Sequence, residues 1–386
     1  SKMARFLFAL LLAAVLAIIS CDGQGSFVDD PAAVPKKKRK RKKQKFKLEI
    51  PRVTVEELAN NDTLKSGLHA YVLHGFAKEK WTAMNWTLDY LKEKIPFEWV
   101  DYYPNNMRDV GSKPFLHNFE KLVPDFKKPH HTPRYMQIRL GRRGWERLKK
   151  DFNPKPLPDV FWDDDEWIKQ CMVKEDGKAD KQAIDNFFVT QQWKFLLIGE
   201  KGTSMFFHKD GTAASSWQVQ LVGRKRWTLC PNTETPLLDV NLDTYDPDYK
   251  RFPKFARALC GQVTVSPGEL LYYPGYWWHH TLQLDTPAVS YTGAMVGVEA
   301  PRTDLTGNHR FSHSQFYEDL QEKCAKCWTK GAEARHCDDN SIRWPGAAPP
   351  PLRRVCDEYL PKCLKMWEDH ADSLHGPKKG SHVAEL

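Results

Sequence analysis

The stretch Gly268-Glu-Leu-Leu-Tyr-Tyr-Pro-Gly-Tyr-Trp-Trp-His-His280 decides the fold class, because it is typical of a buried β-strand that carries a candidate metal ligand. Its apolar run is short and is interrupted by glycine and proline, which favours a strand over a helix. Similar short runs occur at residues 135–140, 193–199, 205–208, 217–222, 226–230, 262–266, 270–273 and 288–292. Together they predict a mainly β fold, either a barrel or a sandwich.

The composition agrees with this class of fold. The chain has 386 residues, enough for one large domain with appendages or for two small domains. Hydrophobic residues make up 41% of the chain and aromatic residues 12%, which is ample for a core. The fourteen tryptophans favour a rigid, aromatic-lined β architecture over a helical bundle.

His208-Lys-Asp210 and the distant His279 form the candidate metal site. On a strand, residues two apart point to the same side, so His208 and Asp210 would face one ion together. Two histidines and one carboxylate occupy one face of a metal and leave the other positions open, as in non-haem Fe(II) oxygenases. Zn²⁺ can use the same three ligands with water as the fourth. The alternative is that all three are ordinary strand residues.

Lys225, in Gly223-Arg-Lys-Arg-Trp227, is the candidate partner for an acidic co-substrate. We expect it to lie on a strand that continues residues 217–222, with Arg224 and Arg226 on the opposite face. An inward-facing lysine is costly unless it pairs with an anion. The alternative is a solvated edge strand.

Taken together, these motifs resemble the JmjC/cupin-like 2-oxoglutarate oxygenases over roughly residues 130–300. The resemblance rests on His208-Lys-Asp210, on residues 217–227 and on residues 267–280. Residues 249–255 and 277–280 are also similar to the asparaginyl hydroxylase that acts on hypoxia-inducible factor. The spacing from Asp210 to Lys225 is closer to that of the JmjC lysyl hydroxylases.

This resemblance implies a double-stranded β-helix of the jelly-roll type that uses Fe(II), 2-oxoglutarate and O₂ to hydroxylate a protein or peptide substrate. It implies that Lys225 pairs with the distal carboxylate of 2-oxoglutarate and that Tyr135 contacts this co-substrate. As the first histidine after the tryptophan pair, His279 matches the family position better than His280. The implied iron ligands are therefore His208, Asp210 and His279.

The chain departs from the family pattern at two positions. Met205 stands where a threonine often helps to bind the co-substrate, and Gly293 stands where an asparagine often lines the site. Tyr291 is a candidate to supply a hydroxyl group instead. Because the three metal ligands are unaffected, the departures concern the co-substrate. They raise the alternative of a cupin-like binding protein that has lost turnover.

The first residues predict entry into the secretory pathway, either to the endoplasmic reticulum lumen or beyond. Phe6–Ile19 is an unbroken apolar run preceded by Lys2 and Arg5, which is typical of a signal peptide and short for a membrane span. The alternatives are a bacterial lipoprotein box at residues 18–21 and an uncleaved signal anchor. Asn61-Asp-Thr63 and Asn85-Trp-Thr87 are acceptor sequons for N-glycosylation, in agreement with secretory entry.

The net charge of +9 is concentrated in one run. Ten lysines and arginines lie between Lys36 and Lys47 with no acid among them, so the rest of the chain is close to neutral. That body gives no strong signal for nucleic-acid binding. The run itself is a solvated tail, a polyanion-binding arm or a nuclear localisation signal. A nuclear signal would make the protein a nuclear JmjC demethylase, an alternative that the apolar start and the sequons disfavour.

The remaining segments complete a five-part organisation. Residues 54–57 resemble a capping box, and residues 81–95 have apolar residues at helical spacing. Residues 316–323 and 355–374 predict helices near the C-terminus. We expect a signal peptide (1–25), a basic arm (26–48), a mixed region packing on the barrel (49–129), the catalytic domain (130–300) and a Cys-containing helical segment (301–386).

Nine cysteines occur in the chain, several of them near its C-terminus. In an oxidising compartment disulfides are the better interpretation of this cluster, and zinc is the alternative. We expect Cys230 to pair with Cys260 and Cys171 to be an ordinary buried residue. The C-terminal cluster consists of Cys324, Cys327, Cys337, Cys356 and Cys363.

Overall fold

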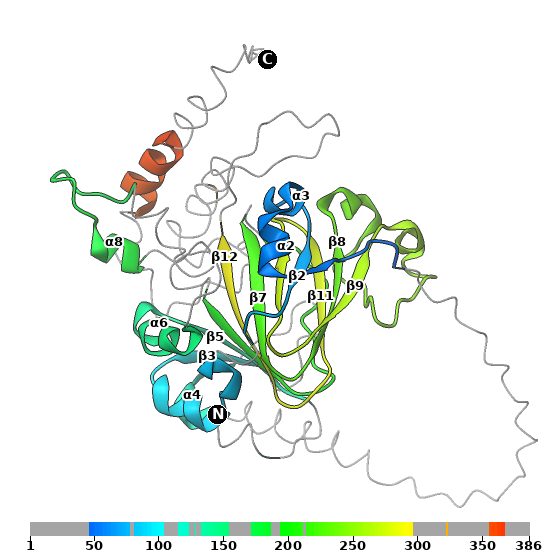
Figure 1. Ribbon diagram of the computed structural model, residues 1–386, viewed down its shortest axis with the longest axis horizontal. Helices are drawn as coiled ribbons and strands as arrows, with labels where there is room; N and C mark the ends of the chain where they lie inside the picture. The colour runs from blue at the N-terminus through cyan, green and yellow to red at the C-terminus, as the bar shows by residue number, and fades with distance from the viewer. Residues whose placement is uncertain are drawn as a thin grey trace, which may run out of the picture. The chain divides into compact units, whose positions relative to one another are not determined.

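The structure is a computed structural model of the chain (Figure 1). It describes residues 46–77, 81–103, 115–122, 128, 133–153, 171–186, 194–210, 214–295, 322 and 355–366. The predicted signal peptide, nearly all of the basic arm, the helix predicted at residues 316–323 (apart from Glu322) and Cys324, Cys327 and Cys337 lie outside these residues. None of the described helices is both long and apolar enough to cross a bilayer.

The larger of two β-sheets has nine strands in the order β1-β2-β10-β7-β12-β6-β5-β3-β4. Neighbouring strands are antiparallel except for β1 and β2, which are parallel. The sheet crosses the domain boundary predicted between residues 129 and 130, since β1 to β4 precede it. The strands are β1 (Arg52–Val53), β2 (Tyr71–Leu73), β3 (Trp99–Tyr103), β4 (Phe115–Asn118), β5 (Tyr135–Arg139), β6 (Phe195–Gly199), β7 (Ser215–Val222), β10 (Leu270–Tyr273) and β12 (Ala288–Met295).

The smaller sheet has three antiparallel strands, with β8 (Lys225–Cys230) between β11 (Trp278–Gln283) and β9 (Gly261–Val265). One face packs against β2 and β10 of the larger sheet. Trp227 and Leu229 meet Val72, Leu271 and Tyr273 in this inter-sheet core. The prediction of a mainly β fold is therefore confirmed.

Helices cover the other face of the larger sheet (Figure 1). Trp81, Trp145 and Phe152 pack there against strand residues that include Trp217 and Tyr291. The helical elements on this side are α2 (Val55–Ala59), α3 (Asp62–Lys65), α4 (Leu88–Lys94), α6 (Arg142–Leu148) and the 3₁₀ turns η1 (Thr82–Asn85) and η2 (Lys149–Phe152). The larger sheet thus has an inner face towards the smaller sheet and an outer face towards the helices.

Side-chain caps determine where α2, α3 and α4 begin. Thr54 caps α2 by accepting from the Glu57 backbone N–H, and the Glu57 carboxylate accepts from the Thr54 N–H, which confirms the predicted capping box. The helical pattern at residues 81–95 is two elements, because Thr87 starts α4 by accepting from the N–H of Tyr90.

Three strand predictions need correction. β7 ends before Lys225, because Gly223 has φ +64° and turns the chain into the second sheet. A Cβ at this glycine would lie 2.7 Å from the carbonyl oxygen of Pro287. The stretch 268–280 is also two strands, β10 and β11, which belong to different sheets. Residues 205–208 form no regular strand, although His208 makes an isolated bridge with His279.

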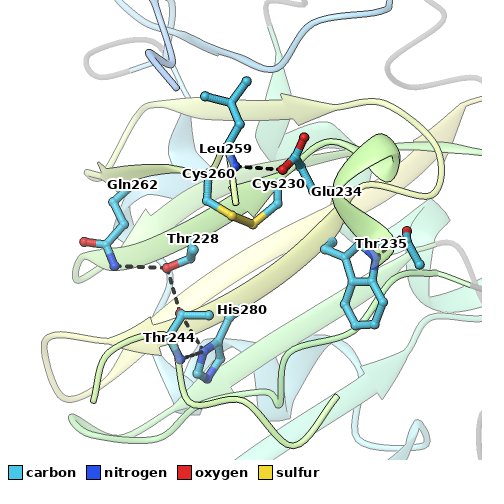
Figure 2. Close-up of a disulfide and its surroundings, with 10 residues drawn as sticks. Thr228, Cys230, Glu234, Thr235, Thr244, Leu259, Cys260, Gln262 and His280 are labelled. Atoms are coloured by element: carbon cyan, nitrogen blue, oxygen red, sulfur yellow. Dashed lines mark hydrogen bonds between the residues drawn. A yellow bond between two sulfur atoms is a disulfide. The ribbon is translucent and has the colours of Figure 1, made fainter. Parts of the chain in front are cut away.

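Two disulfides connect distant parts of the described chain. Cys230 pairs with Cys260 as expected, and this bond closes the insertion between β8 and β9 (Figure 2). The prediction that Cys171 is an ordinary buried residue is wrong, because it pairs with Cys363. A hydrogen bond of 2.8 Å from the Tyr359 hydroxyl to Asp180 joins the same two segments. They contain α8 (Lys181–Asn186), η8 (Val355–Tyr359) and the helix that continues η8 to residue 366.

The insertion, residues 231–259, contains η4 (Asn232–Leu237) and η5 (Pro253–Arg257). Its apolar residues pack against Phe207 and Trp278. These two residues immediately precede His208 and His279 in the sequence. The insertion therefore supports the segments that carry both candidate histidine ligands.

We expect the double variant Cys230→Ala, Cys260→Ala to be less stable than the wild type. A loop of this length loses about 3–4 kcal/mol of stabilisation in the chain-entropy model, which corresponds to a fall in Tm on the order of 10 °C. Scanning calorimetry of the full chain measures the change. An unchanged Tm would contradict this assignment of the disulfide.

Candidate metal centre

A backbone bridge brings His208 and His279 together. The His208 N–H donates to the His279 carbonyl at 3.1 Å, and the His279 N–H donates back to the His208 carbonyl at 2.7 Å. His279 lies on β11, whereas His208 lies in the connection between β6 and β7. Their ring centroids are 4.2 Å apart. This pairing, rather than one shared strand, assembles the site.

Both imidazoles are held in the tautomer that suits metal binding. The Nδ1 atom of His208 lies 2.7 Å from the Phe206 carbonyl oxygen, and the Nδ1 atom of His279 lies 3.0 Å from that of Trp277. A carbonyl oxygen only accepts, so Nδ1 is the protonated nitrogen and Nε2 carries the lone pair in the neutral form of each ring. Burial, reinforced by the neighbouring His279, holds the pKa of His208 well below its ordinary value. A neutral His208 can therefore donate its lone pair at physiological pH.

Asp210 completes the cluster. Its Oδ1 atom lies 3.8 Å from Nε2 of His208 and 3.9 Å from Nε2 of His279, while Oδ2 accepts from the Ser216 hydroxyl at 3.2 Å. One ligand atom from each of the three residues lies within 4.8 Å of the others. This donor set fits Fe(II) with further positions open, and it also suits Zn²⁺.

His280 points to the opposite side of β11 and is fully engaged there. Its Nε2 atom lies 2.8 Å from the Ser204 hydroxyl oxygen. Its Nδ1 atom lies 2.9 Å from the hydroxyl oxygen of Thr244, which also donates to Thr228 (Figure 2). Neither ring nitrogen is left for a metal. The structure thus brings His279, and not His280, to His208 and Asp210.

Lys225 lies fully buried on the inner face of β8. Its ammonium group donates to the side-chain carbonyl of Gln218, on β7 of the other sheet, at 3.3 Å. Burial lowers the pKa of Lys225 to about 7. Arg224 and Arg226 are exposed on either side of it, as the alternation predicts. The ammonium group has no carboxylate partner in the described part of the chain.

Unpaired polar groups surround this buried cation. The Nε2 atom of Gln218, the indole nitrogen of Trp227 and both side-chain polar atoms of Gln283 are buried without a partner among the described residues. Gln283 lies opposite Lys225 in the β8–β11 register. A carboxylate accepts several hydrogen bonds and carries the charge that Lys225 lacks nearby. The set therefore fits one end of a dicarboxylic acid.

The spacing along β11 also suits such a molecule. His279 and Gln283 share a face and are four residues apart, which is about 13 Å at the rise of a β-strand. Lys225 lies opposite Gln283, and its ammonium nitrogen lies 5.5 Å from the centroid of the Trp227 ring. A five-carbon diacid can then extend from Lys225 towards the three candidate metal ligands.

Tyr135 lies at the same end of the site. It is opposite Gly199 in the β5–β6 register, where a Cβ would lie 2.9 Å from the Gln283 side chain and 3.1 Å from the Tyr135 ring. Burial raises the pKa of Tyr135 above its ordinary value, so its hydroxyl group stays protonated and can donate. Met205 packs with Tyr135, and its sulfur lies 3.6 Å from the Gln137 amide nitrogen. The structure therefore brings Tyr135 and Met205 to the end of the site that contains Gln283.

Tyr291 and Gly293 lie on the outer face of the larger sheet. The Tyr291 ring stacks on Trp145 with centroids 5.1 Å apart and an interplanar angle of 7°. A Cβ at Gly293 would lie 2.5 Å from the Trp217 side chain. Ser290 hydrogen-bonds to Gln220 on the inner face of the sheet. Because successive residues of a strand point to opposite faces, Tyr291 and Gly293 belong to the outer face. Tyr291 is therefore not positioned to contact a co-substrate, and Gly293 does not line the site.

Three further residues lie at the site although no sequence motif points to them: Ser216, Gln218 and Tyr273. The Tyr273 ring centroid lies 4.8 Å from that of His279, and burial and the nearby Asp210 raise its pKa well above the ordinary value. A signal was present in the strand Ser215-Ser-Trp-Gln-Val-Gln-Leu-Val222, where polar and apolar residues alternate although nearly all are buried. A buried polar face indicates a site.

Comparison with known proteins identifies the family. A model of the cupin-like domain matches residues 68–293, which is more than half of the chain. The chain belongs to the cupin-like domain family. The match confirms the resemblance stated above. It begins earlier than residue 130, just before strand β2 of the larger sheet.

Two of three individual relatives carry JmjC names. The lysine-specific demethylase JMJ21 of Arabidopsis thaliana is 29% identical over 249 residues, which cover 59% of this chain and 23% of that protein. The JmjC domain-containing protein 8 of Homo sapiens is 39% identical over 92 residues, covering 23% and 33%. HSPB1-associated protein 1 of Homo sapiens is 38% identical over 108 residues, covering 25% and 22%. The matched regions thus span a third or less of each relative.

We expect the affinity for 2-oxoglutarate to fall as the pH rises above about 7, because only the protonated form of Lys225 attracts a carboxylate. The loss is about tenfold per pH unit above that pKa. Calorimetric titration at several pH values, with a redox-inert divalent ion present, measures it. In Lys225→Arg the guanidinium stays charged, so its affinity changes less over the same range. Equal pH dependence in both proteins would contradict the role of Lys225.

Proposed function

We propose that the protein is an Fe(II)- and 2-oxoglutarate-dependent dioxygenase that hydroxylates a protein side chain in the secretory pathway. The observation that carries the proposal is the pairing of a His₂Asp cluster with a buried, carboxylate-free Lys225 inside a cupin-like fold. The cluster alone would equally suit a zinc site, and a buried lysine alone specifies no ligand. Together they fit a metal ion and a dicarboxylic acid held side by side.

The proposed reaction converts a substrate C–H bond, O₂ and 2-oxoglutarate into a C–OH group, succinate and CO₂. Fe(II), held by the three cluster residues, would supply the redox chemistry that O₂ requires. Lys225, with the amides of Gln218 and Gln283, would hold the distal carboxylate. Trp227 and Tyr273 pack beside His279 and limit the access of water to it.

Two further observations support the secretory compartment. The structure contains the disulfides Cys171–Cys363 and Cys230–Cys260, and structural disulfides are rare in the cytosol and nucleus. Both sequon asparagines, Asn61 and Asn85, are exposed. Exposure is what a glycan on either residue requires.

Demethylation is the second candidate, because the relative JMJ21 is named as a lysine-specific demethylase. The same site chemistry serves both outcomes, since hydroxylation of an N-methyl group leads to loss of that group as formaldehyde. The choice depends on which C–H bond the bound substrate presents. HSPB1-associated protein 1 bears the name of a protein partner, which favours a protein substrate in either case.

We expect the purified protein with Fe(II) to form succinate from 2-oxoglutarate in the presence of a suitable peptide. His208→Ala should lower this rate about 100-fold or more, because it removes one of the three metal ligands. His69→Ala is the matched control, since His69 is exposed and lies away from the cluster in the sequence. Succinate is quantified by mass spectrometry over a panel of unmodified and methylated peptides.

The products separate the candidates. A peptide that gains one oxygen atom supports hydroxylation, whereas formaldehyde release with loss of a methyl group supports demethylation. No succinate above the level of His208→Ala, across the panel, would contradict the enzyme proposal and leave a cupin-like binding protein.

We expect the full chain, expressed in cultured eukaryotic cells, to migrate faster in gels after treatment with an N-glycosidase. Asn61→Gln and Asn85→Gln should each remove part of this shift, because each eliminates one acceptor. Asn241→Gln is the control, since Asn241 is exposed but not in a sequon. A chain that never shifts and fractionates with nuclei would contradict the proposed compartment.

A further inference from the structure

Ser216 and Tyr273 lie side by side on the inner face of the larger sheet, next to the candidate metal ligands. They are opposite each other in the antiparallel register of β7 and β10. Both are buried, with exposed fractions of 9% and 6%. Neither has a side chain of the type that usually binds iron through nitrogen or a carboxylate.

The Ser216 hydroxyl group connects this pair to Asp210. The Ser216 hydroxyl donates to Oδ2 of Asp210 at 3.2 Å, and Ser216 also hydrogen-bonds with the Tyr273 hydroxyl. Serine has one hydroxyl proton, and the carboxylate takes it. A hydroxyl oxygen can still accept while its proton is donated, so the adjacent Tyr273 hydroxyl can support Ser216 in this orientation.

The hydrogen bond from Ser216 determines which oxygen of Asp210 faces the histidines. Oδ2 is occupied by Ser216, whereas Oδ1 is the atom 3.8 Å and 3.9 Å from the two Nε2 atoms. The Asp210 side chain is 40% exposed, and Asp210 belongs to no strand or helix. Without a partner on Oδ2, little in the described structure would prevent rotation of the carboxylate.

Tyr273 also contacts the histidine side of the cluster. Its ring centroid lies 4.8 Å from that of His279 and 5.7 Å from that of Trp227. One residue thus packs against a candidate ligand through its ring and orients another through its hydroxyl group. A change at Tyr273 that keeps the ring can separate these two effects.

We propose that Ser216 and Tyr273 are positioning residues that orient Asp210 for a divalent metal ion and thereby increase metal affinity without touching the metal. This inference rests on the proposed metal site, and it goes beyond the ligands themselves. Partners of metal ligands in general contribute about 10–100-fold in affinity. The structure assigns this contribution to the hydroxyl groups of Ser216 and Tyr273. Among the described residues, Ser216 is the hydrogen-bond donor to the Asp210 carboxylate.

The test is direct titration of the purified full chain with Co²⁺, followed by its visible absorption, which reports both affinity and ligand geometry. Ser216→Ala should bind Co²⁺ about tenfold more weakly and with a changed spectrum. Tyr273→Phe keeps the ring and should show a smaller loss. Ser216→Thr retains a hydroxyl group and should restore most of the affinity.

The chain provides a matched control on the same two strands. The hydroxyl groups of Tyr272 and Ser215 are hydrogen-bonded at 3.0 Å. Both residues neighbour the proposed pair in sequence, but Tyr272 packs in the outer-face core. Ser215→Ala and Tyr272→Phe remove an equivalent hydrogen bond. They should lower the Tm without changing Co²⁺ affinity.

The outcomes distinguish this inference from the proposed function. Wild-type protein that binds no Co²⁺ would overturn the metal site itself. Wild-type binding with equal affinity in Ser216→Ala and Tyr273→Phe would overturn the positioning role alone. The positioning role would also be overturned if Ser215→Ala and Tyr272→Phe lost as much Co²⁺ affinity as Ser216→Ala and Tyr273→Phe. If Ser216→Ala does not fold, Tyr273→Phe, which preserves shape, still decides the question.

Discussion

The buried ammonium group of Lys225 is the constraint on which the rest of the structure depends. An uncompensated charge inside a protein costs several kcal/mol, and one hydrogen bond to the Gln218 amide offsets only part of this. The lowered pKa of Lys225 reduces the cost by allowing the neutral form near pH 7. An anionic ligand offsets it more completely. The fold thus keeps an unfavourable group at the place where a dicarboxylic acid would make it favourable.

The two-sheet architecture makes this arrangement possible. Gly223 turns the chain sharply between β7 and β8, so that Gln218 and Lys225 come to face each other from different sheets. The same division separates β10 from β11, which places Tyr273 beside His279 across the inter-sheet core. Segments that are close in sequence therefore meet face to face, and polar groups from both sheets come together near the ring contact of Trp227 and Tyr273.

Residue types and local patterns allowed much of this to be predicted. Donor chemistry points to the three candidate ligands, strand alternation to the inward Lys225, and a local motif to the Thr54 cap. The pairing of Cys171 with Cys363 could not be predicted, because a contact over a sequence separation of 192 leaves no local signal. Tyr291 was placed on the wrong side because identity alone does not tell which of two strand faces is inward. Its neighbour Trp217 shares the same outer face.

The two departures from the family pattern, Met205 and Gly293, have different consequences for the site. A side chain at position 293 would meet the Trp217 ring on the outer face, so Gly293 concerns packing and leaves the site unchanged. Met205, in contrast, packs beside Tyr135 and offers only a thioether, which is a weak acceptor and donates no hydrogen bond. Binding of an acid must then depend on the donors that do face the site, namely Lys225 and the free amide and indole N–H groups around it. These groups outnumber the one hydroxyl that Met205 replaces, so the loss of that hydroxyl alone is no reason to infer loss of co-substrate binding.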